Sequence, residues 1–370
     1  MIKILYKKVL KPVLFLFKAD DVHSLFLKVG NFLGRFEIMR KITKKIFHYE
    51  NKILNQKVLD IEFENPIGLA AGFDYDADLI GILPAVGFGF DTVGTVTALP
   101  YGGNPRPMLD RLPKSQSLLV NKGFKSHGIM KVLEKVHDAK RGIPFGISIG
   151  STNRTYKDTE EMVDDIVFSF GKIIEKNYFD FYELNISCPN LINIENLKDK
   201  LDTPLGFTLL LNKLSFLKIN RPVFIKMYLE KSVDDTLKIV DIAKDYKWVS
   251  GLIFSNLVKD RTNPKFDKDE IKVAGKGNFS GKPTEEIGNN LISEVYKKYK
   301  DRFIIIGCGG VFTGADAYEK IKRGATLIQM ITGMIYEGPS QIGLINKELA
   351  ELLAKDGHKN IQDAIGVYHQ

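Results

Sequence analysis

The feature that most constrains the fold is a regular alternation of short apolar runs and amphipathic stretches from residue 60 onward. The runs have the length and the β-branched content of strands buried on both faces. There are eight such runs, at Ile67–Phe73, Thr92–Thr97, Phe145–Gly150, Phe181–Ser187, Val223–Tyr228, Gly251–Asn256, Phe303–Gly307 and Leu327–Thr332. Helical patterns lie at Thr159–Lys176, Val233–Tyr246, Glu285–Tyr299, Ala315–Arg323 and Gln341–Ala354. Eight βα units predict an α/β fold, a (β/α)8 TIM barrel, because a doubly wound sheet more often has five or six strands.

Polar and glycine residues follow almost every predicted strand. In a (β/α)8 barrel these strand ends meet at one mouth, which is where such folds bind their ligands. Gly309-Gly310 and Gly333 follow the last two strands, where barrels commonly hold a phosphate. The glycine-rich loop 275–283 is expected to fold towards the same pocket. The pattern predicts a binding site at the mouth.

Lys226 lies inside the apolar strand Phe224-Ile225-Lys226-Met227. A buried ammonium group is costly unless it meets an anion or an electron-rich ring. A phosphate-bearing planar cofactor would use both Lys226 and the glycines. The alternative is a buried ion pair between Lys226 and an acidic residue of the barrel.

The stretch Asn185-Ile186-Ser187-Cys188-Pro189-Asn190 places a thiol between two amides at the end of a predicted strand. A thiol held in this way can act as a general base, and the alternative is an inert buried cysteine. Cys188 and Cys308 are the only cysteines, and they show no CxxC spacing. This usage argues against a zinc site or a disulfide framework and favours a reducing compartment, so we expect no metal.

Residues 1–48 carry the whole basic excess of the chain. They hold eleven Lys and Arg against three acidic residues, a balance of +8 that equals the net charge of all 370 residues. Apolar residues are interleaved with these lysines, and the longest uninterrupted run, Val13–Phe17, is too short to span a bilayer. We expect basic amphipathic helices that lie on an anionic membrane surface. The alternative is a lysine-rich helical pair packed on a soluble core, and the neutral remainder disfavours nucleic acid.

Seven motifs in order resemble those of one known family. They are Asn65 to Asp74, Gly103 to Pro107, Arg111-Leu112-Pro113, Asn121 to Phe124, Asn185 to Asn190, Ser280 to Pro283 and Ile306 to Val311. Together they resemble the dihydroorotate dehydrogenases, most of all the membrane-associated, quinone-dependent class. The resemblance implies a barrel of residues 49–370 that binds FMN and oxidises (S)-dihydroorotate to orotate in pyrimidine biosynthesis. It also implies that residues 1–48 form a membrane and quinone segment, peripheral to the cytoplasmic face of the cell membrane.

The resemblance also implies roles for single residues. Cys188 stands at the position of the base that removes the C5 proton. The expected FMN residues are Ala71, Gly72, Tyr75, Thr95, Ser148, Asn185, Lys226, Ser255, Gly281, Gly310 and Thr332. The expected substrate residues are Asn121, Lys122, Gly123, Phe124, Asn185, Asn190 and Asn256. His23 and Arg111 resemble the polar pair of the quinone pocket.

Several positions depart from the family pattern. The quinone-dependent class generally has serine where this chain has Cys188, and Tyr75 replaces a lysine that meets the substrate carboxylate. The loop Asn121-Lys122-Gly123-Phe124 is one residue shorter, so we expect Lys122, or less favourably Lys125, to take over the carboxylate. These departures leave open a related dihydropyrimidine substrate, a soluble electron acceptor or a flavin-binding barrel without catalysis.

Overall fold

Eight parallel strands form a closed barrel in a computed structural model that describes residues 2–191, 194, 197, 199–254 and 256–370. In order around the barrel they are β3 (Ile67–Leu69), β4 (Phe90–Val96), β7 (Phe145–Ile149), β8 (Phe181–Asn185), β9 (Val223–Lys226), β10 (Val249–Phe254), β12 (Ile304–Cys308) and β13 (Leu327–Met330). The predicted barrel is confirmed, strand for strand. The predicted strands mostly run too far at their carboxyl ends, because the chain leaves the sheet there to form the rim of the mouth.

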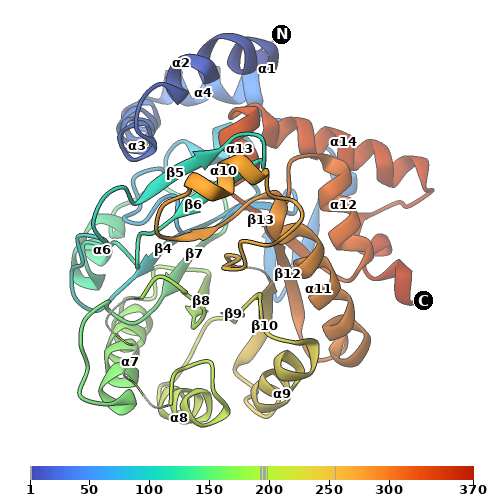
Figure 1. Cartoon of the computed structure of the whole chain (residues 1–370). Helices are drawn as coiled ribbons and strands as arrows, with labels where there is room; N and C mark the ends of the chain where they lie inside the picture. Colours follow the sequence, from blue (N-terminus) through green and yellow to red (C-terminus); the bar gives the residue numbers. More distant parts are fainter. Residues whose placement is uncertain (1, 192–193, 195–196, 198, 255) are drawn as a thin grey trace.

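Helices surround the barrel (Figure 1). They include α5 (Leu83–Val86), α6 (Ile129–Val136), α7 (Thr159–Lys176), α8 (Pro204–Ser215), α9 (Val233–Ala243), α11 (Glu285–Tyr299), α12 (Gly314–Lys322), α13 (Thr332–Glu337) and α14 (Gln341–Lys355). Side-chain oxygens of Asp158, Thr203, Ser232 and Thr313 accept backbone N–H bonds at the starts of α7, α8, α9 and α12. Such caps satisfy N–H groups that have no partner within the helix.

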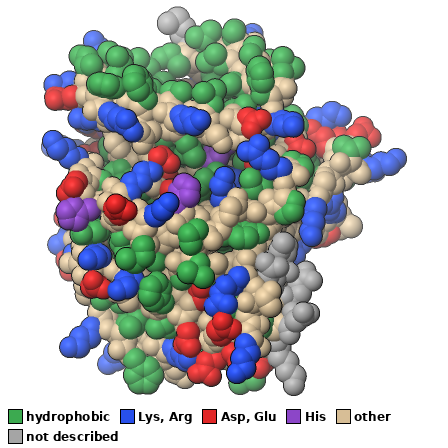
Figure 2. Space-filling model, turned by 90° about the vertical axis from the view of Figure 1, so that its left-hand side faces the viewer, with side chains coloured by type: hydrophobic (Ala, Val, Ile, Leu, Met, Phe, Trp, Pro, Cys, Tyr) green, Lys and Arg blue, Asp and Glu red, His purple; other side chains and the backbone are tan. Residues whose placement is uncertain are grey.

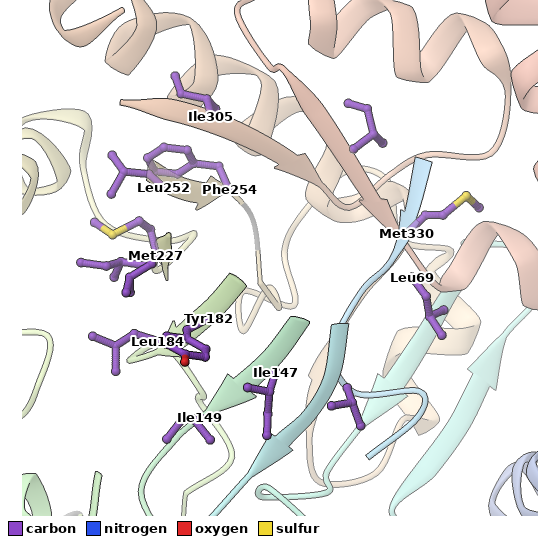
Figure 3. Close-up of a cluster of buried hydrophobic side chains, with 14 of the residues drawn as sticks. Leu69, Ile147, Ile149, Tyr182, Leu184, Met227, Leu252, Phe254, Ile305 and Met330 are labelled. Carbon is purple, nitrogen blue, oxygen red and sulfur yellow. The ribbon is translucent and has the colours of Figure 1, made fainter. Parts of the chain in front are cut away.

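The core has two layers, set by the alternation of side chains along each strand. Outward-facing residues such as Ile147, Leu184 and Leu252 pack beneath the helices (Figure 3). Inside the barrel, a second cluster contains Val58, Phe63, Phe90, Phe181, Phe224, Ile253, Ile306 and Leu327. Val58 and Phe63 belong to an antiparallel hairpin of β1 (Gln56–Val58) and β2 (Ile61–Phe63). This apolar plug fills one end of the barrel, so ligand binding is confined to the other.

A three-stranded antiparallel sheet that we did not predict accompanies the barrel. Its order is β11 (Asn278–Phe279), β6 (Ser117–Val120), β5 (Leu109–Leu112), and the short helix α10 (Lys268–Val273) precedes β11. The glycine-rich loop 275–283 supplies β11, and Phe279 pairs with Leu119. This pairing holds the loop beside the barrel mouth.

The N-terminal helices form a separate layer over the barrel mouth, at the top of Figure 1. We call residues 2–47 the N-terminal cap. It contains α1 (Ile2–Leu5), a π-helical turn (Tyr6–Leu10), α2 (Lys11–Phe15), α3 (Ala19–Arg35) and α4 (Glu37–Phe47). The Tyr6 hydroxyl donates to the Ile335 carbonyl (2.7 Å), and Lys3 and Lys7 pair with Glu337 at 3.0 and 2.9 Å. These contacts fasten the start of the cap to α13.

Candidate active site

A cavity of about 370 Å³ lies between the cap and the carboxyl ends of the strands. The loops after five barrel strands contribute to its wall, together with the end of β9, helix α3 and the sheet beside the mouth. The sequence-predicted residues that line it are His23, Ala71, Gly72, Tyr75, Thr95, Arg111, Lys122, Gly123, Phe124, Asn185, Cys188, Asn190, Lys226, Asn256 and Thr332. Predicted cofactor, substrate and quinone residues therefore surround one continuous space.

Four predicted site residues are not part of the cavity lining, and a fifth is not described. Asn121 and Ser148 are buried behind the wall, where Asn121 accepts from the Asn104 amide at 2.9 Å. Gly281 and Gly310 also lie outside the lining. Ser255 falls outside the described residues.

Strand β8 contributes polar side chains to the interior of the barrel. Phe181, Glu183 and Asn185 alternate with outward-facing residues, so they point inward at successive heights. Phe181 belongs to the apolar plug, the Glu183 carboxylate accepts from the Ser148 hydroxyl (2.7 Å), and Asn185 reaches the cavity. Sequence analysis missed Glu183, although its spacing of two residues from Asn185 indicates the same face of the strand.

The buried ion pair that we considered as the alternative for Lys226 is present. Its Nζ lies 3.6 Å from Glu183 Oε1, and both side chains are almost fully buried. Burial lowers the pKa of Lys226, but the charge and hydrogen bond of Glu183, together with the nearby Cys308 and Cys188, raise it above its ordinary value. Because Lys226 also lines the cavity, it presents a permanently charged ammonium group to whatever binds there.

Cys188 lies three residues beyond the end of β8, between Asn185 and Asn190 in the cavity wall. Burial of the thiol raises its pKa to about 12, against the opposing effects of the Asn190 backbone N–H and the charges of Lys226 and Lys259. The thiol therefore stays protonated at neutral pH in this environment. Proton abstraction by Cys188 would need ionisation that a bound ligand assists or that high pH supplies.

The amides of the site belong to a hydrogen-bonded network centred on Asn104. Its side-chain nitrogen donates to Asn121 Oδ1 (2.9 Å) and to the Asn190 carbonyl (3.0 Å). Asn278 of β11 donates to Asn190 Oδ1 at 2.6 Å. We did not assign Asn104 a role, although it lies in one of the motifs that carry the resemblance. The network fixes the orientation of Asn190 before any ligand arrives.

The two residues expected at the quinone end lie against the cap. Arg111 Nη1 donates to the Phe17 carbonyl (2.8 Å), and its guanidinium lies 4.5 Å from the Phe15 ring centroid. His23 is buried on α3, with Nε2 2.9 Å from the Phe73 carbonyl. The wall around them is apolar and includes Phe15, Val22, Phe26, Leu33, Phe73 and Ile335.

Comparisons with known proteins agree on one family. The family model described as dihydroorotate dehydrogenase matches residues 53–353. The chain is 33% identical to the dihydroorotate dehydrogenase (quinone) of Christiangramia forsetii, over 94% of this chain and 99% of that protein. It is also 33% identical to that of Myxococcus xanthus, over 97% of each. A crystal structure of the DHODH from Eimeria tenella in complex with ferulenol matches with a TM-score of 0.81 at 25% identity, covering 95% of this chain and 96% of that one.

The chain belongs to the dihydroorotate dehydrogenase family. The two curated relatives named above are of the quinone type, and the family uses a flavin.

The cavity of this dihydroorotate dehydrogenase fits a flavin cofactor. Gly94 lines it with a φ of 117°, and a Cβ there would lie 2.6 Å from the Ser148 carbonyl oxygen, so the position requires glycine. The glycine allows β4 to lie close to the backbone of Ser148 on β7 at the cavity wall. Lys226 and the Asn185 amide face the same space and supply hydrogen-bond donors.

One cluster in this dihydroorotate dehydrogenase lies apart from the cavity. His48 Nε2 lies 2.9 Å from Glu50 Oε1 and 3.8 Å from Glu64 Oε2, a grouping of the kind that can bind a metal ion. The Lys44 ammonium is 2.6 Å from the same Glu50 oxygen. The Lys44 ammonium group thus already serves as the cation for this carboxylate. The sequence pattern gave no indication of the cluster.

Proposed function

We propose that this protein oxidises (S)-dihydroorotate to orotate in pyrimidine biosynthesis, with FMN as cofactor and a quinone as electron acceptor. The observation that carries the proposal is the continuity of the cavity. At the barrel end it offers a thiol, three asparagine amides and a charged lysine. At the cap end it is apolar, as a hydrophobic acceptor requires, with Arg111 at its edge.

In this proposal the barrel residues hold the substrate and move one proton. The side-chain amides of Asn185, Asn190 and Asn256 match the paired N–H and C=O groups of a pyrimidine ring. The thiolate form of Cys188 takes the proton from C5 and becomes the thiol, and the cap shields this step from water. Bound FMN would supply the site that accepts hydride from C6 and passes electrons to the quinone. Lys226, Thr95 and Thr332 are the lining residues best placed to hold the cofactor.

We also propose that residues 1–48 form the membrane-binding segment, peripheral to the cytoplasmic face. Figure 2 shows hydrophobic side chains gathered over the cap at the top of the view, with lysine and arginine side chains beneath them. Most exposed large hydrophobic residues belong to this segment, including Ile4, Leu10, Leu16, Phe32 and Ile38. Among the described residues, every helix is too short or too polar to cross a bilayer. A surface of this kind fits shallow insertion among anionic lipids.

The test is anaerobic addition of dihydroorotate to the FMN-loaded protein, followed by a quinone. The proposal expects the yellow flavin absorbance to bleach with substrate and to return when the quinone is added. Bleaching without recovery by quinone, but with recovery by fumarate or NAD, would indicate a soluble acceptor. Persistent colour with dihydroorotate would favour a related dihydropyrimidine as substrate, or a flavin-binding barrel without catalysis, and would overturn the proposal.

A further inference from the structure

Lys122 is a buried lysine in the wall of the cavity. It lies in the loop between β6 and α6, and only 8% of its surface is exposed. Its Nζ donates to the Tyr75 hydroxyl at 2.9 Å and lies 3.4 Å from His23 Nδ1. Among the described residues, no carboxylate forms an ion pair with it. The ammonium group also lies 4.3 Å from the Tyr75 ring centroid, which offsets part of the cost of its burial, but no anion in the described part of the chain balances its charge.

The hydrogen bonds around Lys122 have a defined direction. The Phe73 carbonyl can only accept, so the proton of His23 is on Nε2, 2.9 Å away. His23 Nδ1 then accepts from the Tyr75 hydroxyl (2.7 Å), whose oxygen accepts from Lys122. One N–H of Lys122 is used, and two remain to bind a ligand.

The charged groups around the hydrogen-bonded set of Lys122, Tyr75 and His23 do not supply an anion for the Lys122 ammonium group. Asp20 on α3, the acid whose charge raises the pKa of Lys122, directs its carboxylate to the backbone N–H groups of Met108 and Leu109 at 3.0 and 3.3 Å. Lys125 adds further positive charge. Burial lowers the pKa of Lys122 to about 7, and burial together with the lysine charge lowers that of His23 to about 3. His23 is therefore neutral, and a bound anion would favour the charged form of Lys122.

Other cations in the cavity wall are already engaged. Lys226 is paired with Glu183, and Arg111 donates to the cap and lies over Phe15. Lys125 is only half-buried and lies 5.9 Å from the Tyr75 ring centroid. Lys122 thus remains as the buried cation that faces the space also lined by Cys188, Asn190 and Asn256.

We propose that Lys122 binds the carboxylate of the substrate, and that Tyr75 and His23 are positioning residues that hold its ammonium group. The inference rests on the proposed function, because dihydroorotate and orotate are ring carboxylates. Tyr75 occupies one side of the ammonium group and so directs the remaining N–H groups. His23, with both ring nitrogens bonded inside the protein, acts through Tyr75 and couples the cap to the anion site.

The experiment measures binding of orotate and uracil to the FMN-loaded protein, through the change that each causes in the flavin absorbance. Uracil has the same ring without the carboxylate. The substitution Lys122→Met removes a charged hydrogen-bond donor. It should therefore weaken the affinity for orotate by roughly 10- to 100-fold and change the affinity for uracil by no more than about twofold. Lys131→Met, at an exposed lysine of α6 outside the cavity wall, is the control and should leave the affinity for both ligands unchanged.

Tyr75→Phe tests the positioning role. It removes only the hydroxyl, so the KM for dihydroorotate should rise by roughly 3- to 10-fold while kcat stays within about twofold. In a Lys122→Met background, Tyr75→Lys places an ammonium group near the same point and should restore most of the orotate affinity. A drop in kcat with unchanged KM would overturn the role of Tyr75.

The outcomes separate this inference from the proposed function. If dihydroorotate does not bleach the wild-type flavin, the proposed function fails. If it does, but Lys122→Met binds orotate as tightly as wild type, the carboxylate site is elsewhere and this inference alone fails. Equal weakening of orotate and uracil would show a general disturbance of the pocket and would also overturn it. The flavin content of each variant reports on folding.

Discussion

Cys188 shows how strongly its surroundings set the chemistry of one residue. An ordinary thiol ionises near pH 8.5, whereas burial raises the pKa of this one to about 12. The rate of flavin reduction by dihydroorotate should therefore rise by about tenfold per pH unit from pH 7 to 10, because the thiolate fraction does so. Stopped-flow measurement under anaerobic conditions checks this. A plateau between pH 8 and 9 would mean that bound flavin and substrate lower the thiol pKa.

Removal of the thiol gives a second prediction at the same position. Cys188→Ala should slow flavin reduction by about 10²- to 10⁴-fold, the usual loss when a positioned base is removed. Orotate binding should change little, because the ring amides and Lys122 remain. Cys308→Ala, which changes a residue outside the cavity wall, is the control and should reduce at the wild-type rate. A Cys188→Ala enzyme with full activity would show that another group takes the proton.

Local sequence predicted some of these residues and not others. Asn185, Cys188 and Asn190 lie within six positions, so one strand end brings them together. Burial of Lys122 depends on Tyr75 and His23, which are 47 and 99 positions away. The shortened loop suggested that Lys122 turns inward, but only the fold supplies the hydroxyl that meets it. The raised pKa of Cys188 likewise depends on tertiary burial.

At the scale of elements, strand β4 carries an unusual acid. Asp91 is almost fully buried, and among the described residues no lysine or arginine forms an ion pair with it. Burial, with the nearby Asp74 charge, raises its pKa well above the ordinary value. A raised acid pKa in the folded state stabilises the protein below the unfolded pKa, and this stability is lost as pH rises towards the folded pKa.

Asp91→Asn should therefore increase the free energy of unfolding at pH 7 by roughly 1–3 kcal/mol, because the variant has no carboxyl proton to lose. The increase in the free energy of unfolding should become smaller as the pH falls towards 4. Urea unfolding of the flavin-loaded protein at pH 5 and 7 measures it, with the exposed Asp301→Asn as control. A less stable Asp91→Asn at both pH values would indicate that the carboxyl group makes hydrogen bonds that the amide cannot replace.

The barrel strands were predictable because parallel strands buried on both faces are continuous apolar runs. The sheet of β5, β6 and β11 was not, for two physical reasons. Strand β5 contains Asp110 and Arg111, so it lacks an apolar run, and β11 is only two residues long. Both pair through backbone hydrogen bonds to β6, which leave no signature in the side chains.

At the scale of the whole molecule, the exposed apolar residues of the cap predict that the protein binds membranes. Ile4 and Leu16 are 60% and 84% exposed in the cap, and Leu205 is 71% exposed on α8 of the barrel. The wild-type protein should sediment with vesicles that contain anionic lipid, and less so at high salt. The double substitution Ile4→Glu with Leu16→Glu should abolish this, because two charges would enter the acyl boundary.

Leu205→Glu is the matched control, since it adds a charge at an equally exposed leucine far from the cap (Figure 1). Its sedimentation with vesicles should equal that of the wild-type protein. Equal loss of vesicle binding for both variants would indicate that net charge alone drives binding to the vesicles. Full binding by the cap variant would refute insertion of this surface.

The cap does more than face outward, because it also forms one wall of the cavity. Tyr6, Phe15 and His23 line the cavity from within the first 47 residues. A truncated protein that begins at the barrel would gain solubility but lose this wall, and the Tyr75 hydroxyl would lose its acceptor on His23. Inhibitor affinities measured on such a shortened protein would describe an open half-pocket, so ligand screening should use a protein that includes the cap.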